Sequence, residues 1–532
     1  AENGCGKMSF FDAATLRRIK KLGVTHVWYT GIIRHASKTD YSAYGIPRQH
    51  PAVVKGNAGS PYAITDYYDV DPDLADNIDD RMSEFEQLVE RSHKAGLKVI
   101  IDFVPNHVAR QYKSVKKPEG VKDLGETDDT GMGFSPRNNF YYCTDTPFEP
   151  YFDLNDETGT PYSEFPAKAT GNDHFDSHPG INDWYETVKL NYGIDYCDAG
   201  GRSYHFDPIP DTWQKMVDII SFWAGKGIDG FRCDMAEMVP TEFWSWAIAK
   251  VKSAHPGILF IGEVYNPSLY RSFVACGFDY LYDKVGMYDC LCGVMRGHCR
   301  ASEITRQWQS VDDIKDNMLY FLENHDELRI ASDFLAGDAR RGVPAAIVSI
   351  LMNKNPFMLY AGQEFGERGM DKEGFSGLDG RTTIFDYWTV QSLYHGYVNR
   401  RKLTDGEKSL EKKYSMLLNL ANKEKAISDG LFFDLMYANQ DGNLFNQSSL
   451  YAFLRKCSNE VLLVVANFSQ EEAECSVRLP HHAFEYLNLP EKTVTASDLL
   501  SEGNAISFEL KPDCLVHMSV PGCGGRIYKF KV

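Results

Sequence analysis

Apolar residues follow two alternating patterns between about residue 12 and residue 425. Stretches with apolar residues at helical spacing predict amphipathic helices at residues 9–23, 81–96, 211–227 and 241–254. Between them lie short, almost continuously apolar runs that predict strands at residues 24–30, 97–104, 228–234, 258–264, 278–283, 318–324 and 356–362. Strands of this kind that alternate with helices predict an α/β fold, in which helices cover a parallel sheet.

The count of seven strands leaves two architectures open. A (β/α)8 TIM barrel needs eight strands, and the alternative is an open doubly wound sheet. The sequence opens on a helix rather than on a strand. We favour the barrel, with its first strand missing from this chain and lying upstream of residue 1 in the natural one. We therefore expect a sheet with an uncovered edge.

Two segments depart from the alternation. Residues 108–205 are rich in Gly, Asn, Asp, Tyr and Pro without sustained periodicity, which predicts an irregular inserted lobe. From about residue 430, six alternating runs separated by polar turns predict an antiparallel β-sandwich. The expected domains are a first part of the barrel, the lobe, a second part of the barrel and the sandwich, at residues 1–107, 108–205, 206–428 and 429–532.

Composition and charge indicate which classes of partner and which cellular location to expect. The chain has 56 Lys and Arg against 74 Asp and Glu, a net charge of −18, which makes nucleic acid and anionic membranes poor partners. No apolar run approaches the roughly 18 residues of a membrane span, and no secretory signal or nucleotide-binding loop is visible, so no organic cofactor is expected. Twelve cysteines are too few for a disulfide scaffold, so we expect reduced thiols and a cytoplasmic location. A periplasmic or secreted location is the alternative if a signal was removed.

Acidic residues fall at the ends of four predicted strands. Asp102, Asp234, Glu263 and Asp326 each follow an apolar run. In a barrel enzyme the active site lies at the carboxyl ends of the strands, so these carboxylates should converge on one cleft. Three further polar residues stand beside them: Arg232, His107 and His325.

Converging carboxylates and imidazoles fit either a divalent-metal site or glycoside cleavage. Arg232 lies two residues before Asp234 on the same strand face, and a fixed cation there would repel a metal. Beside a nucleophile it would keep Asp234 ionised, while Glu263, in a drier and more acidic neighbourhood, stays protonated. Retaining glycoside cleavage, with the two carboxyl groups about 5 Å apart, is the better fit.

Four short motifs at these strand ends resemble the signatures of the α-amylase family of glycoside hydrolases (glycoside hydrolase family 13). The motifs are DFVPNH at 102–107, GFRCD at 230–234, GEV at 262–264 and ENHD at 323–326. They occur in the family's order, and the resemblance covers almost the whole chain. It implies a (β/α)8 barrel with a lobe inserted after the third strand and a C-terminal β-sandwich.

The resemblance also implies roles for individual residues. Asp234 is the nucleophile, Glu263 the general acid and then base, and Asp326 stabilises the oxocarbenium-like state. The mechanism implied is double displacement through a covalent glucosyl ester on Asp234. Substrate-binding or supporting roles fall to five further residues: Arg232, His107, His325, Tyr62 and Asp102.

This sequence departs from the family pattern, and the resemblance leaves a metal open. Glu237 and Met238 stand where many members have Lys-His, three and four residues after the nucleophile. Asn106 matches the family's side-chain ligand of a structural calcium, although it could equally bind only backbone. The lobe offers many acids as its partners, with no spacing that assigns one: Asp153, Asp156, Asp195 and Asp198.

Three functions remain in view. The leading hypothesis is a retaining α-glucan hydrolase that cleaves α-1,4 bonds of starch, glycogen or maltodextrins. The same residues would serve a transglycosylase that passes the glucosyl unit to a sugar. A non-catalytic relative is disfavoured because Asp234, Glu263 and Asp326 are all present.

Overall fold

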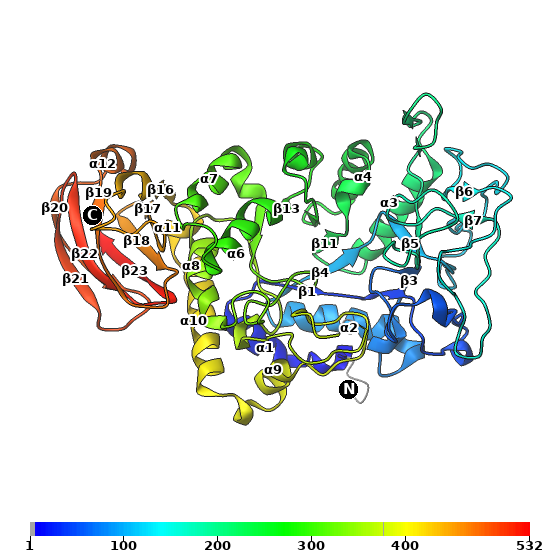
Figure 1. Cartoon of the computed structure of the whole chain (residues 1–532), viewed down its shortest axis with the longest axis horizontal. Coiled ribbons are helices and arrows are strands. Elements are labelled where there is room, and N and C mark those ends of the chain that lie inside the picture. The colour runs from blue at the N-terminus through cyan, green and yellow to red at the C-terminus, as the bar shows by residue number, and fades with distance from the viewer. Residues whose placement is uncertain (1–5, 376) are drawn as a thin grey trace.

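The computed structural model describes residues 6–375 and 377–532. A parallel sheet of seven strands, in the order β1-β4-β11-β12-β13-β14-β15, forms the centre of the molecule (Figure 1). Its strands are β1 (His26–Tyr29), β4 (Lys98–Phe103), β11 (Gly230–Cys233), β12 (Leu259–Gly262), β13 (Tyr280–Tyr282), β14 (Met318–Phe321) and β15 (Phe357–Met358). Each lies within one of the seven predicted runs, and the parallel curled sheet confirms the barrel fold class over the open doubly wound alternative.

Helices that precede, separate and follow these strands cover the sheet. They are α1 (Ala13–Leu22), α2 (Arg81–Lys94), α3 (Asp211–Ala224), α4 (Thr241–Ala254), α5 (Tyr270–Ala275), α6 (Asp289–Met295), α7 (Glu303–Ser310), α8 (Val343–Leu351), α9 (Gln391–Leu393), α10 (Asp405–Lys423) and α11 (Lys425–Ser428). The Asp12 side chain caps α1 by accepting from the Thr15 N–H, and Gly23 ends it at φ 109°. No helix within the described residues is long and apolar enough to cross a membrane.

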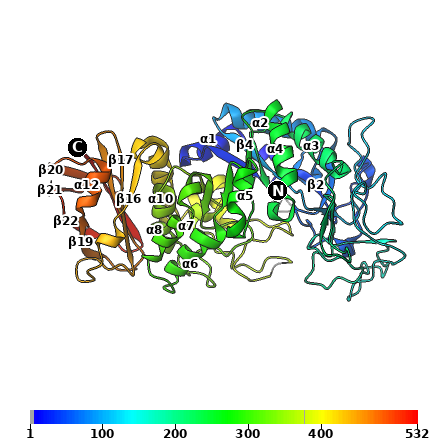
Figure 2. The ribbon, with the colours of Figure 1, turned by 90° about the horizontal axis from the view of Figure 1, so that it is seen from above.

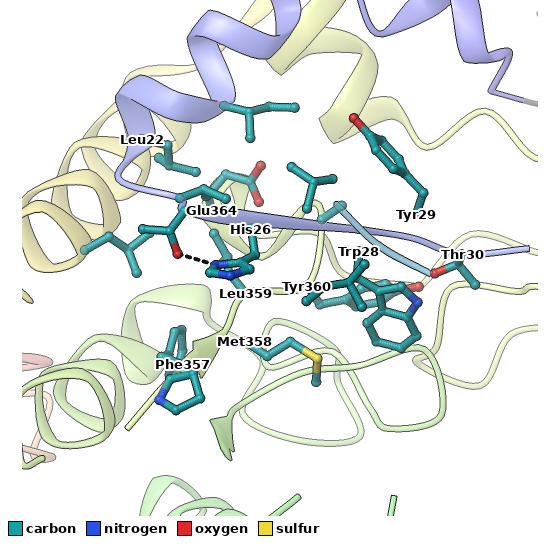
Figure 3. Close-up of a pocket in the computed structure, with 18 of the residues that line it drawn as sticks. Leu22, His26, Trp28, Tyr29, Thr30, Phe357, Met358, Leu359, Tyr360 and Glu364 are labelled. Atoms are coloured by element: carbon teal, nitrogen blue, oxygen red, sulfur yellow. Dashed lines mark hydrogen bonds between the residues drawn. The ribbon is translucent and has the colours of Figure 1, made fainter. Parts of the chain in front are cut away.

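The sheet is not closed between its two end strands. No strand ladder joins β1 to β15 among the described residues, and a cavity of about 960 Å3 lies there instead. His26 and Trp28 of β1 and Phe357 and Met358 of β15 line it (Figure 3). The expected uncovered edge is therefore present at both ends of the seven-stranded sheet.

The residues between β4 and α3 form a lobe of short antiparallel ladders at one end of the molecule (Figures 1 and 2). Its strands are β5 (His107–Ala109), β6 (Tyr142–Cys143), β7 (Ala167–Lys168), β8 (Thr187–Lys189), β9 (Ile194–Asp195) and β10 (Ser203–Tyr204), and a separate pair is β2 (Ile33–His35) with β3 (Ile64–Val70). Arg110 lies buried inside the lobe and stabilises it. Its guanidinium pairs with Glu164 at 3.0 Å and lies 3.9 Å from the centre of the Phe148 ring.

The C-terminal domain is antiparallel and lies at the opposite end from the lobe (Figure 1). One sheet has the order β16-β17-β18-β23-β20-β21, and β19 pairs with β22 in a second. The bounds are β16 (Leu431–Asp434), β17 (Leu450–Cys457), β18 (Glu460–Asn467), β19 (Ala473–Leu479), β20 (Lys492–Asp498), β21 (Ala505–Leu510), β22 (Cys514–Val520) and β23 (Gly524–Lys531), with α12 (His481–Leu487) between β19 and β20.

A buried arginine joins this domain to the barrel. Arg455 of β17 is 2% exposed, and its guanidinium donates to the backbone carbonyls of Met352, Ala426, Ile427 and Gly430. These carbonyls lie at or just beyond the carboxyl ends of α8 and α11, where helices leave C=O groups without partners. One side chain thus satisfies four acceptors at the junction.

Replacement of Arg455 by Met is expected to lower the free energy of unfolding by about 3 kcal/mol, because buried carbonyls would lose a charged donor. Urea unfolding followed by circular dichroism measures this loss. Lys456→Met, at the next position of the same strand, is the control and should change stability little. An Arg455→Met protein as stable as the wild type would contradict this view of the junction.

Candidate active site

Strand register brings the predicted carboxylates to one edge of the sheet. Arg232 of β11 pairs with Asp102 of β4 and with Ile261 of β12. The ladder continues past the strand ends, because the Asp234 N–H donates to the Phe103 carbonyl at 2.9 Å and the Glu263 N–H to the Cys233 carbonyl at 3.1 Å. Asp102, Asp234 and Glu263 therefore stand side by side on neighbouring strands.

The Arg232 guanidinium lies between these three carboxylates. It is 1% exposed, and its Nη1 lies 2.8 Å from Asp234 Oδ1 and 3.4 Å from Asp102 Oδ1, while its Nη2 lies 2.8 Å from Glu263 Oε2. Three aromatic rings surround it at 5.1 to 5.6 Å from their centres, those of Trp28, Tyr62 and Tyr282. The predicted convergence of these residues is present in the structure.

One electrostatic expectation is wrong. Arg232 was expected to keep Asp234 ionised, but burial raises the pKa of Asp234 well above its usual value in spite of the Arg232 charge. Arg232 also contacts Asp234 and Glu263 at the same distance. Glu263 also accepts from the Met235 N–H at 2.9 Å and from the Tyr265 hydroxyl at 2.5 Å, so it has two hydrogen-bond donors beside the ion pair with Arg232. A guanidinium offers donors on two sides, which sequence spacing does not reveal.

Burial is the largest influence on the pKa values of Asp234 and Asp102. It raises the pKa of Asp234 well above its usual value, against the opposing charge of Arg232. It also raises the pKa of Asp102 to about 6, although Arg232 and the Trp28 indole N–H, which donates to Asp102 Oδ2 at 2.8 Å, favour the ionised form. The carboxylates thus form a coupled group with one guanidinium at its centre.

Asp326, His325 and Tyr62 form the more open side of the site. The Asp326 side chain is 46% exposed, compared with 8% for Asp234. His325 Nε2 lies 2.8 Å from the Tyr62 hydroxyl and 3.1 Å from Asp326 Oδ2, and the rings of His325 and Tyr62 stack with centres 5.3 Å apart. Burial lowers the pKa of His325 to about 3, so its imidazole is neutral at neutral pH. Tyr62 is therefore placed beside the predicted residues.

A buried ion pair fixes the loop that carries Asp326. Arg329 Nη1 donates to Glu323 Oε2 at 2.8 Å, and both side chains are almost fully buried. Asn324 Oδ1 accepts from the Asp326 and Glu327 N–H groups at 2.9 Å each. The ENHD motif thus uses Glu323 and Asn324 to shape the turn that presents His325 and Asp326.

His107 begins β5, next to Asn106, at the junction of barrel and lobe. Burial, followed by the charge of Lys189, lowers its pKa to about 3. The Asn106 amide nitrogen lies 3.1 Å from His107 Nδ1. His107 is therefore a neutral imidazole whose Nδ1 faces the Asn106 amide.

The residues around Asn106 do not fit the structural calcium that the resemblance implies. Asn106 Oδ1 accepts from Lys189 Nζ at 2.5 Å, so a side-chain ammonium stands where an ion would bind. The lobe residue that meets this ammonium is Asp173, rather than any of the four acids considered from the sequence. Within residues 6–375 and 377–532, no three His, Cys, Asp or Glu side chains are grouped as a metal site.

Four residues of the site were not predicted. Tyr265, Trp28 and Tyr282 contact Glu263, Asp102 and Arg232 as described above, and Lys189 contacts Asn106. Tyr265 lies two residues after Glu263, and Tyr282 is the next-to-last residue of the strand predicted at 278–283, so strand position could have indicated both. The departure at Glu237 also has a structural role, since its carboxylate accepts from the N–H groups of Tyr265 and Asn266.

These carboxyl groups and the guanidinium stand at the carboxyl ends of parallel barrel strands, which is where barrel enzymes have their active sites. A family model described as "Alpha amylase, catalytic domain" matches residues 13–415. The chain belongs to the α-amylase family of glycoside hydrolases.

Individual relatives are distant. Alpha-amylase 3 of Dictyoglomus thermophilum is 24% identical over 77% of this chain and 74% of its own length. The chain spans a smaller share, 42% and 50%, of two further amylase relatives, and other relatives are named as a neopullulanase and as maltosyltransferases.

Solved structures agree in fold. A maltogenic α-amylase of Thermotoga neapolitana, AmyB, matches with a TM-score of 0.63 and 20% identity, over 99% of this chain and 96% of that one. An α-amylase of Geobacillus thermoleovorans complexed with acarbose matches with a TM-score of 0.61 and 19% identity, over 98% and 91%.

The pKa of Asp102 gives a prediction about stability. The folded value of about 6 lies above the value of about 3.9 in an unfolded chain, so this carboxyl stabilises the fold when protonated. Its contribution is complete at low pH and is lost as the pH rises through about 6, a change of about 3 kcal/mol.

We therefore expect wild type to lose about 3 kcal/mol of unfolding free energy relative to Asp102→Asn between about pH 4 and about pH 7. Urea titrations of both proteins across this range measure the difference. A difference that stays constant with pH, or grows in favour of wild type, would show that Asp102 is not titrating in this window.

Proposed function

We propose that this protein is a retaining α-glucan hydrolase that cleaves α-1,4 bonds of starch, glycogen or maltodextrins. The observation that carries the proposal is the meeting of Asp234 and Glu263 on one guanidinium at neighbouring strand ends, with Asp326 on the more open side. The family adds support, since several relatives of this chain are named as alpha-amylases.

The first step joins the sugar to the enzyme. A carboxylate oxygen of Asp234 attacks the anomeric carbon, the glycosidic C–O bond breaks, and its electron pair leaves on the oxygen that takes a proton from Glu263. Protonation makes one Glu263 oxygen a donor. Arg232 and the Met235 N–H cannot accept, whereas the Tyr265 hydroxyl can, so Tyr265 is the partner that accommodates the acid form.

The second step releases the sugar. Glu263, now ionised, takes a proton from water as the water oxygen attacks the anomeric carbon, and the bond to Asp234 breaks. In this proposal Asp326 stabilises the positive charge that develops on the sugar, and Tyr62 stacks against it. The neutral imidazoles of His107 and His325 can bind hydroxyl groups without adding positive charge near that carbon.

The alternative acceptor is a second sugar, which would make the enzyme a transglycosylase. Relatives named as α-1,4-glucan:maltose-1-phosphate maltosyltransferases match about 23% of this chain and support this alternative. Glu237 and Met238, which replace the Lys-His of many members, lie in the turn that follows Asp234. The two reactions share the first step and differ only in what attacks the ester.

Asp234→Asn and Glu263→Gln should each lower turnover of maltodextrin by several orders of magnitude while the far-ultraviolet circular dichroism stays unchanged, because each removes a reacting group. Release of reducing ends measures turnover. Asp229→Asn is the matched control, since Asp229 lies at the opposite end of β11 and binds the Val99 N–H. Near-normal rates in either active-site variant would reject these roles and favour a non-catalytic relative.

The covalent step has its own test. A 5-fluoroglucosyl fluoride, which slows release of the sugar, should leave a fluoroglucosyl adduct on the peptide that contains Asp234, as found by mass spectrometry. An adduct on another residue would displace Asp234 as nucleophile.

Incubation with maltotriose distinguishes transfer to water from transfer to a second sugar. A hydrolase should give glucose and maltose, whereas products longer than maltotriose, resolved by chromatography over the time course, would favour the transglycosylase.

A further inference from the structure

Lys189 places its ammonium at the junction of barrel and lobe. The side chain is 2% exposed, and Nζ lies 2.5 Å from Asn106 Oδ1 and 2.6 Å from Asp173 Oδ1. The carbonyl oxygen of Met238 lies 3.5 Å away on a third side, and the Tyr196 ring centre lies at 5.8 Å. The amine thus meets an amide oxygen, a carboxylate and a backbone carbonyl from three separate segments.

These three oxygens are typical ligands of a hard divalent cation, which binds oxygen at about 2.3 to 2.6 Å. Nζ occupies that distance from two of them already. A divalent ion at the same point would overlap the amine and would be repelled by its charge. The junction is therefore built around a side-chain cation.

The segments that Lys189 joins have separate positions in the fold. Asn106 follows β4 in the barrel, Asp173 belongs to the lobe, and Met238 ends the short turn after Asp234. Lys189 itself ends β8, where it pairs in register with His107. Asp173 adopts a left-handed backbone conformation at φ 63°. Aspartate tolerates this conformation better than most residues do.

The ammonium also decides which way the Asn106 amide faces. Because Lys189 can only donate, it requires the amide oxygen, which leaves the NH2 group to donate to the Gly171 carbonyl at 2.7 Å and toward His107 Nδ1 at 3.1 Å. A donor at Nδ1 makes that nitrogen an acceptor. The proton of neutral His107 then lies on Nε2.

We propose that Lys189 is a built-in cation that replaces a structural metal at the barrel–lobe junction and, through Asn106, sets the tautomer of His107. Lys189 is a positioning residue in this account, and the proposal does not depend on which glucan reaction the enzyme performs.

The wild-type protein provides the first test, with calcium as the probe. Its melting temperature, measured by differential scanning calorimetry, should be unchanged by exhaustive chelation and by calcium added back. A loss on chelation that calcium restores, and that Asn106→Ala abolishes, would overturn the proposal. A calcium response that persists in Asn106→Ala comes from another part of the protein and leaves the junction metal-free.

Variants of the lysine provide the second test. Lys189→Met keeps most of the aliphatic chain and removes the charge, so its melting temperature should fall by several degrees. Lys122→Met is the matched control, because Lys122 pairs with Glu126 at 2.8 Å in the same lobe but is 65% exposed, and surface pairs contribute little.

The tautomer of His107 can be measured separately, and loss of packing alone would not change it. Nitrogen-15 spectra of the histidines, with the His107 signals assigned by their absence from His107→Gln, should show Nε2–H alone in wild type and a mixture of tautomers in Lys189→Met. Wild type with its proton on Nδ1, or a Lys189→Met variant with unchanged melting temperature and unchanged His107 signals, would contradict the proposal. If Lys189→Met does not fold, the wild-type spectrum and calorimetry still decide.

Discussion

The site depends on the burial of one guanidinium among carboxylates. Each of these groups would be costly to bury alone, and only their mutual contacts make the arrangement tenable. Arg232 contacts the side chains of Asp102, Asp234 and Glu263, which come from three neighbouring strands. Strand register sets where these three carboxyl groups stand relative to one another. Loss of the cation would leave several buried acids that could only take up protons, which is why Arg232 supports the site both electrostatically and in its geometry.

Buried side-chain cations also contact carboxylates in other parts of the molecule. Arg329 fixes the loop of Asp326 through Glu323, Arg110 holds the lobe through Glu164, and Lys189 joins the lobe to the barrel through Asp173. Each cation is almost fully buried and touches a carboxylate within 3.0 Å. A chain with a net charge of −18 has many acids to place, and these few internal cations determine which of them are brought together.

The sequence predicts the strands and also the strand ends that carry the candidate site. Both follow from the local pattern of apolar and acidic residues. Parallel strands buried on both faces must be apolar, and the acids that follow them must lie at one edge. What could not be predicted depends on tertiary contacts. Glu263 shares Arg232 with Asp234 because a guanidinium has donors on two sides, and Asp173 reaches Lys189 because of the path of an irregular lobe. In the C-terminal domain, β20 and β23 were also missed as separate strands.

Among the described residues, the sheet is open along a seam between β1 and β15. The helices on either side of the seam contact each other even though the strands do not. Asn419 and Asn422 of α10 donate to the carbonyls of Leu22 and Gly23 at the end of α1, at 3.3 and 2.7 Å. This approach requires a residue without a side chain, since a Cβ on Gly23 would lie 2.7 Å from Leu418 Cβ. The outer layer therefore closes across the gap, and Trp28, which lines the cavity, stays in place to bind Asp102 and pack against Arg232. Within residues 6–375 and 377–532, helix contacts and the Trp28 indole are thus what the structure places on the open side of β1.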